Sequence, residues 1–141
     1  MQRKIKSWTM TTGLGVMLFI TATSVCAGKF DGTSNLVCAA IDVVACTDGS
    51  TCLHGQARTF DLPEFLAIDF NQKVVRATEE SGHKQVSPIM NVEQTGTQMV
   101  LQGVENGHGW SMSIDQKTGR ITTTVSGEEV GFMVFGACTT L

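Results

Sequence analysis

Apolar and polar residues alternate along several stretches in the second half of the chain. Residues 110–115 read WSMSID and residues 121–126 read ITTTVS, so that apolar side chains recur at alternate positions. A period of two is typical of a β-strand that buries one face. Residues 130–136, VGFMVFG, are apolar at nearly every position and predict a strand that is covered on both faces.

Dipeptides that favour turns separate these stretches at spacings of 8 to 14 residues. They are Asn71-Gln72, Ser81-Gly82, Thr95-Gly96, Asn106-Gly107, Thr118-Gly119 and Ser126-Gly127. Such regular punctuation is expected of short antiparallel strands, and it leaves little room for helices. Together with residues 36–46 and 52–70, the pattern predicts about eight strands.

Two segments before residue 71 are less regular. Residues 36–46 favour a strand because four of them are β-branched, namely Val37, Ile41, Val43 and Val44. The neighbouring alanines also permit a short helix. Pro63 has no backbone N–H group, so it breaks residues 52–70 and predicts one helical turn before a strand resumes at residues 65–70.

These elements predict a single all-β domain over residues 28–141, since no linker or long repeat divides that part of the chain. A meander of about eight strands avoids exposed edges by closing on itself. Our first prediction is therefore a small antiparallel up-and-down β-barrel that disulfides stabilise. A two-sheet β-sandwich is the alternative.

Residues 1–27 have the pattern of a secretory signal peptide. Three basic residues precede an apolar run over residues 14–20, and Val25 and Ala27 occupy the small-residue positions before a cleavage point. We expect cleavage after Ala27, with lipidation at Cys26 as the alternative. The apolar run is too short to cross the roughly 30 Å hydrocarbon core of a bilayer, so no membrane span is expected. The mature protein is expected to be periplasmic or secreted.

The chain beyond the expected signal peptide is acidic. Residues 28–141 contain seven lysines and arginines against thirteen aspartates and glutamates, a net charge of −6, whereas the whole chain has −3. Nucleic acids and anionic membrane surfaces would repel such a chain, so neither is expected as a partner. The charge permits a basic protein as partner.

Four cysteines follow residue 27, an even number that predicts two disulfides in an exported domain. Cys46 and Cys52 flank a turn at Asp48-Gly49 that brings their sulfurs together, which leaves Cys38 for Cys138. A zinc site would need closely spaced pairs such as Cys-x-x-Cys, which the sequence lacks. No metal site is therefore predicted from the cysteines.

His108, Trp110 and Met112 lie at alternate positions and would share one face of a strand. Neutral imidazole and thioether groups suit Cu(I), and an indole face attracts cations. In this chemistry the triplet resembles small periplasmic copper carriers, which are compact β-barrels, and the resemblance implies a Cu(I) carrier. The simpler interpretation places the tryptophan and the methionine in the core with Ile114 and leaves the histidine exposed in a turn.

Motifs of the common catalytic sites are absent from the sequence. There is no Gly-x-Ser-x-Gly elbow, no phosphate-binding glycine loop and no His-Glu-x-x-His pair, and two disulfides would leave no free cysteine after residue 27. We therefore predict a non-enzymatic binding or structural module without a cofactor. An eight-stranded barrel either fills its own interior or holds one small apolar ligand.

In size, expected compartment and architecture the chain also resembles periplasmic lysozyme inhibitors, which are small disulfide-containing β-barrels. The resemblance implies that this acidic protein binds a basic cell-wall hydrolase. Some of these inhibitors insert a Ser-Gly-x-x-Tyr loop into the enzyme cleft. The nearest stretch here is Ser81-Gly82-His83-Lys84, and the chain contains no tyrosine.

Overall fold

The computed structural model describes residues 30–47 and 49–141, so the expected signal peptide and Cys26 lie outside the described residues. The described part of the chain forms strands and two short 3₁₀ turns. The strands are β1 (Leu36–Thr47), β2 (Thr51–Gly55), β3 (Phe65–Asp69), β4 (Val74–Ala77), β5 (Val86–Pro88), β6 (Asn91–Thr95), β7 (Gln98–Glu105), β8 (His108–Asp115), β9 (Arg120–Ser126) and β10 (Val130–Thr140). The 3₁₀ turns are η1 (Ala57–Phe60) and η2 (Glu79–Ser81).

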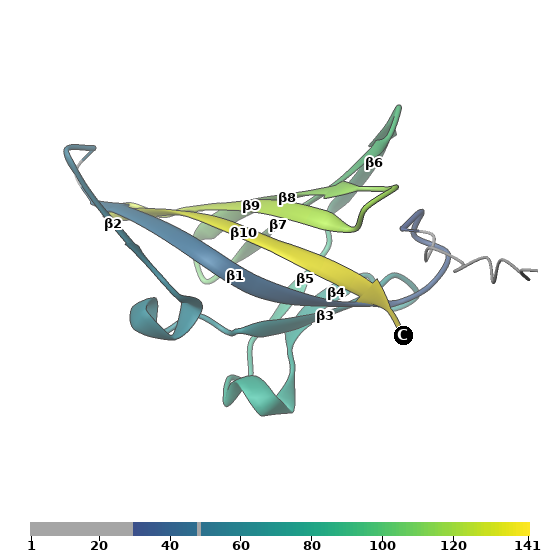
Figure 1. Cartoon of the computed structure of the whole chain (residues 1–141), viewed down its shortest axis with the longest axis horizontal. Coiled ribbons are helices and arrows are strands. Elements are labelled where there is room, and N and C mark those ends of the chain that lie inside the picture. Colours follow the sequence, from purple (N-terminus) through teal and green to yellow (C-terminus); the bar gives the residue numbers. More distant parts are fainter. Residues whose placement is uncertain (1–29, 48) are drawn as a thin grey trace, which may run out of the picture.

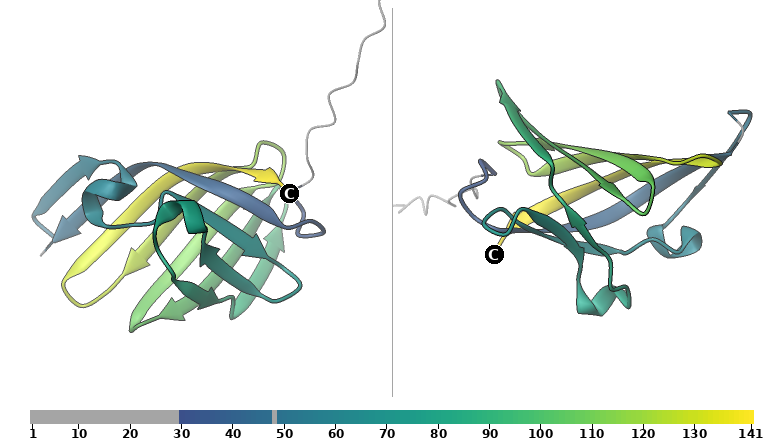
Figure 2. Two further views of the ribbon diagram at one scale, coloured as in Figure 1. Left: turned by 90° about the horizontal axis from the view of Figure 1, so that it is seen from below. Right: turned by 180° about the vertical axis from the view of Figure 1, so that it is seen from behind.

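The strands form one antiparallel sheet in the order β5-β4-β3-β1-β10-β9-β8-β7-β6, and β2 pairs with β1 beside this path. The sheet curls into a half-barrel, which Figures 1 and 2 show from three directions. The prediction of an all-β antiparallel fold is confirmed. The described residues contain ten strands rather than about eight, because residues 52–70 yield both β2 and β3 and residues 86–95 yield both β5 and β6.

Strand β1 lies in the interior of the sheet, beside its middle strand β10, and confirms the strand interpretation of residues 36–46. It pairs with β10 along almost its whole length, with β3 near its start and with β2 near its end. The register with β10 shifts between Ala40 and Asp42, which marks a β-bulge. A bulge bends a strand and increases its twist. The long yellow and blue strands in Figure 1 show how far this central pair extends across the sheet.

The helical turn expected around Pro63 lies earlier in the chain, at η1, and this position was predicted wrongly. The turn ends at Asp61, which adopts a left-handed conformation with φ of 53°. Aspartate tolerates that conformation better than most residues because its short side chain bonds locally. Pro63 lies in the irregular segment between η1 and β3.

The chain between β5 and β6 connects the two ends of the sheet. Strand β5 forms one end of the sheet and pairs with β4, and β6 forms the other end and pairs with β7. Between them, the Ile89 N–H donates to the Lys73 carbonyl oxygen at 2.8 Å and the Met90 N–H donates to the Gln102 carbonyl oxygen at 2.8 Å. These bonds hold one continuous segment against both ends of the curled sheet.

The hydrophobic core lies on the concave face of this sheet. Its members are Phe30, Leu36, Cys38, Ile68, Val75, Ile89, Met99, Leu101, Met112, Ile114 and Ile121, with Trp110 packed against them. The core thus contains the row of alternating residues on β8 that the sequence pattern indicated. The expectation that residues 130–136 are covered on both faces is wrong. Met133 and Phe135 remain 42% and 39% exposed, because no second layer covers the convex side of β10 among the described residues.

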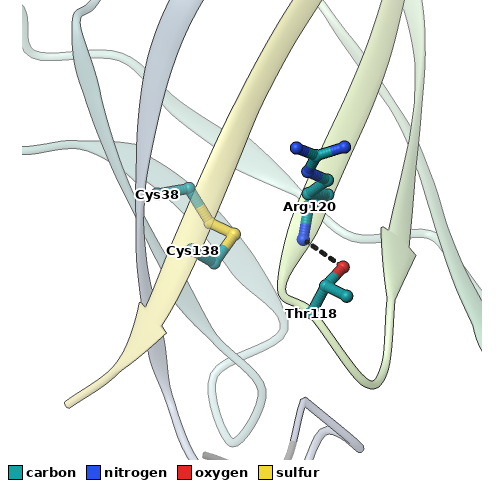
Figure 3. Close-up of a disulfide and its surroundings, with 4 residues drawn as sticks. All are labelled: Cys38, Thr118, Arg120 and Cys138. Carbon is teal, nitrogen blue, oxygen red and sulfur yellow. Dashed lines mark hydrogen bonds between the residues drawn. A yellow bond between two sulfur atoms is a disulfide. The ribbon is translucent and has the colours of Figure 1, made fainter.

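Both predicted disulfides are present, and each joins residues that lie directly opposite on paired strands. Cys38 on β1 bonds to Cys138 on β10, with a Cα–Cα distance of 3.9 Å, and Cys46 on β1 bonds to Cys52 on β2. Figure 3 shows the first bridge beside the turn that precedes β9. That turn is tied to the bridge because the Cys138 N–H donates to the Gly119 carbonyl oxygen at 2.8 Å.

Candidate binding cavity

A cavity of about 350 Å³ lies on the same face of the sheet as the core. Apolar side chains from six strands line most of its wall, among them Ala40, Leu66, Val75, Met112, Ile121 and Val134. Small-molecule sites in proteins usually measure about 300–1,000 Å³ and are mostly apolar, with a few placed polar groups. The cavity therefore has the size and the lining of a site for a small ligand.

Two cross-strand rows build one wall of the cavity. Trp110, Val125 and Phe132 lie opposite one another on β8, β9 and β10, and Met112, Thr123 and Val134 form the next row. All six residues line the cavity. The alternation of the three strands produces these rows, because side chains two residues apart share a face and paired strands keep the faces aligned.

Thr123 stands at the centre of the second row and is only 8% exposed. Its hydroxyl has no hydrogen-bond partner among the described residues. A buried polar group without a partner costs about 1–3 kcal/mol, and buried polar groups in folded proteins nearly always have one. The oxygen itself has almost no accessible surface, so Thr123 lines the cavity with the other atoms of its side chain.

Trp110, in the first of these rows, is held in place by contacts of its indole ring. The indole Nε1–H donates to the hydroxyl oxygen of Ser87 at 2.6 Å, and Ser87 is 4% exposed. The indole also packs over the backbone of Gly103, where an added Cβ would lie 2.5 Å from Cζ2 of the ring. These contacts fix the orientation of the largest side chain in the cavity wall.

Polar residues gather where β7 turns into β8. Glu105, Asn106 and His108 line the cavity there, and Gln85 joins them from the segment before β5. The ring Nδ1 of His108 lies 3.1 Å from the Asn106 carbonyl oxygen. Gly127 covers the other ring nitrogen, since an added Cβ there would lie 2.6 Å from Nε2. We refer to Gln85, Glu105, Asn106 and His108 as the polar rim.

The structure brings the three residues of the copper hypothesis to one wall of the cavity. His108 is exposed at the polar rim, Trp110 is partly buried, and Met112 is 1% exposed. In the described part of the chain, no group of three or more histidine, cysteine, aspartate or glutamate residues is placed to hold a metal ion. A Cu(I) site at this wall would therefore depend on the His108 imidazole, the Met112 sulfur and the Trp110 indole.

Other residues with candidate chemistry serve local structure. The hydroxyl of Ser81 accepts a hydrogen bond from the Phe65 N–H and donates to the Phe65 carbonyl oxygen, both at 2.9 Å, so it anchors η2 to β3. Asp115 accepts hydrogen bonds from the backbone N–H groups of Thr118 and Lys117 in the turn after β8. These bonds, with Thr118 making the largest contribution, lower the pKa of Asp115 from its ordinary value.

Sequence reasoning identified His108, Trp110 and Met112 but missed Thr123, Ser87 and Glu105. Thr123 carried a signal, because it is the polar member of the inward-facing set at positions 121, 123 and 125. Glu105 carried one as well, because the predicted Asn106-Gly107 turn places it opposite His108. Ser87 carried none, since it reaches the cavity only because the sheet curls and brings β5, at one end, close to β7.

Comparison of the chain with family models, with curated proteins and with solved structures finds no match. Among the described residues, no helix has the length and apolar character to cross a membrane. The two disulfides fit a protein that folds outside the reducing cytoplasm.

Proposed function

We propose that this protein is an exported, non-enzymatic binding module that holds a small, mainly apolar molecule in the concave cavity. The observation that carries the proposal is the mostly apolar cavity of about 350 Å³, which apolar residues from six strands line on the concave face of the sheet. A packed interior would have no such space.

The rest of the domain supports this role. Two disulfides and the segment that connects the sheet ends hold the cavity wall in shape, which reduces the ordering cost of binding. The expected signal peptide and the disulfides support a periplasmic or secreted location, with residues 28–141 as the mature module.

The first experiment measures binding of a neutral, fluorescent apolar probe, N-phenyl-1-naphthylamine. We expect its emission to rise and saturate when the protein is titrated into it. Ala40→Phe places a large side chain into the cavity from β1 and should weaken binding at least tenfold, because it removes space that the probe needs. Ala77→Leu, from β4, should weaken binding in the same direction.

Ala39→Phe is the matched control, because Ala39 precedes Ala40 on β1 and does not line the cavity. The control variant should bind the probe as the unaltered protein does. Far-UV circular dichroism and urea unfolding should show that all three variants are folded. Equal affinities of the Ala40→Phe and Ala39→Phe variants would place the probe elsewhere and refute the cavity as its site.

A Cu(I) carrier is a second candidate function, because His108, Trp110 and Met112 all line this cavity. In the proposed mature module, residues 28–141, Trp110 is the single tryptophan, and we expect Cu(I) to quench its fluorescence. Met112→Leu keeps the side chain apolar and removes the sulfur, so quenching should be lost. A titration without quenching in the unaltered module would eliminate this candidate. Inhibition of a basic cell-wall hydrolase stays a prediction of the sequence.

A further inference from the structure

We infer that the cavity selects its ligand by charge and takes an organic cation, with an apolar body in the cavity and a positively charged group at the polar rim. This inference rests on the proposed binding function and adds the chemical class of the ligand. Three features of the cavity support it: the sign of its charge, the position of that charge, and the aromatic ring beside it.

Glu105 provides the charge. Among the described residues that line the cavity, it is the only aspartate or glutamate, and lysine and arginine do not occur in the lining. Its side chain is partly buried, and it has no salt bridge within the described part of the chain. An unpaired carboxylate beside an apolar cavity attracts a cationic group and repels an anionic one. A fatty acid or another apolar carboxylate is therefore a poor match.

The position of Glu105 suits a ligand that enters with its apolar end first. Glu105 lies opposite His108 at the end of the β7–β8 pair, where the chain turns. Thr123 lies deeper, since it pairs with Met112. A charged group at the turn would keep contact with water, which avoids most of the desolvation cost of burying an ion. The apolar body would cover the rows formed by β8, β9 and β10.

Trp110 adds a second group that favours a cation. It lies two residues after His108 on the same face of β8, and it pairs with Gly103, which is two residues before Glu105 on β7. The bond to Ser87 fixes its indole against the cavity. The π face of an indole attracts cations and is the best of the aromatic side chains for this purpose. Carboxylate and indole thus occur together at one end of the cavity.

The test compares three competitors that share a ten-carbon chain and differ in charge: decylamine, decanol and decanoate. Each is titrated, below its critical micelle concentration, against bound N-phenyl-1-naphthylamine at pH 8, where an alkylamine is protonated. We expect decylamine to bind about fivefold more tightly than decanol, in line with a partly exposed ion pair and a cation–π contact. Decanoate should bind most weakly.

Glu105→Gln removes the charge and nearly preserves the shape of the side chain. In this variant decylamine should lose its advantage and bind no more tightly than decanol, whereas the affinity for decanol should not change. Glu93→Gln makes the same change in charge on β6, at an exposed residue outside the cavity lining, and should alter no affinity. Because both variants have the same net charge, a general effect of protein charge would appear in both.

The outcomes separate the charge preference from the proposed function. If the probe binds and all three competitors displace it equally, or decanoate binds most tightly, the charge preference is refuted and the binding function stands. If the probe does not bind, calorimetry with decylamine and decanol replaces the displacement assay. If decylamine binds with a measurable heat and Glu105→Gln abolishes that heat, the result supports the inference. If neither compound gives a heat of binding, both proposals are overturned.

Discussion

Removal of the disulfide between Cys38 and Cys138 is expected to lower the free energy of unfolding by about 4–5 kcal/mol. The bridge spans 100 residues of sequence, and in the chain-entropy model a loop of that length restricts the unfolded chain by this amount. Small domains have total stabilities of only about 5–15 kcal/mol. The double variant Cys38→Ala and Cys138→Ala should therefore unfold at a much lower urea concentration.

The second disulfide offers a matched control within the same strand. Cys46 and Cys52 are separated by only 6 residues, so the same model gives about 2 kcal/mol for their bridge. The double variant Cys46→Ala and Cys52→Ala removes the same atoms from an end of β1 that is more exposed. Urea unfolding followed by circular dichroism compares the two variants directly. Equal losses would contradict the expected dependence of the stabilisation on loop length.

Most of the secondary structure could be predicted because it depends on local signals. The turn dipeptides predicted the ends of strands, and Asn106 and Gly107 adopt positive φ angles of 48° and 80° at such a turn. The alternation in residues 110–115 predicted the buried face of β8, since a period of two has one structural meaning in a strand. The cysteine pairing followed from elimination, once a short turn joined Cys46 to Cys52.

The errors came from features that depend on tertiary contacts. The convex face of β10 is exposed because no layer packs on it in the described part of the chain, and the apolar residues Met133 and Phe135 could not show this. The sequence likewise contained no signal that the sheet would curl far enough to bring β5, at one end, close to β7. We could therefore not predict from the sequence whether the interior is filled or holds a ligand, and Ser87 was not identified.

Gly103→Ala is expected to destabilise the fold by about 1–3 kcal/mol, the usual cost of forcing extra volume into a packed site. Gly103 lies on β7 and does not have the positive φ that would require a glycine, so the constraint is one of space. An added Cβ would collide with the Pro88 carbonyl oxygen and lie 2.5 Å from Cζ2 of Trp110. Neither neighbour can move aside easily, because one is the backbone of Pro88 and the other is the Trp110 ring that Ser87 holds in place.

Gly109→Ala is the control, because Gly109 lies on the paired strand β8 and an added Cβ there meets only the Ser126 hydroxyl at 3.6 Å, an ordinary contact. Alanine is favoured over glycine inside a strand by about 0.5–1 kcal/mol, so this variant should be as stable as the unaltered protein or slightly more stable. Urea unfolding gives both values. A Gly103→Ala variant as stable as Gly109→Ala would mean that the segment between β5 and β6 moves freely away from β7. The wall of the cavity that contains Ser87 and Trp110 would then not be preformed.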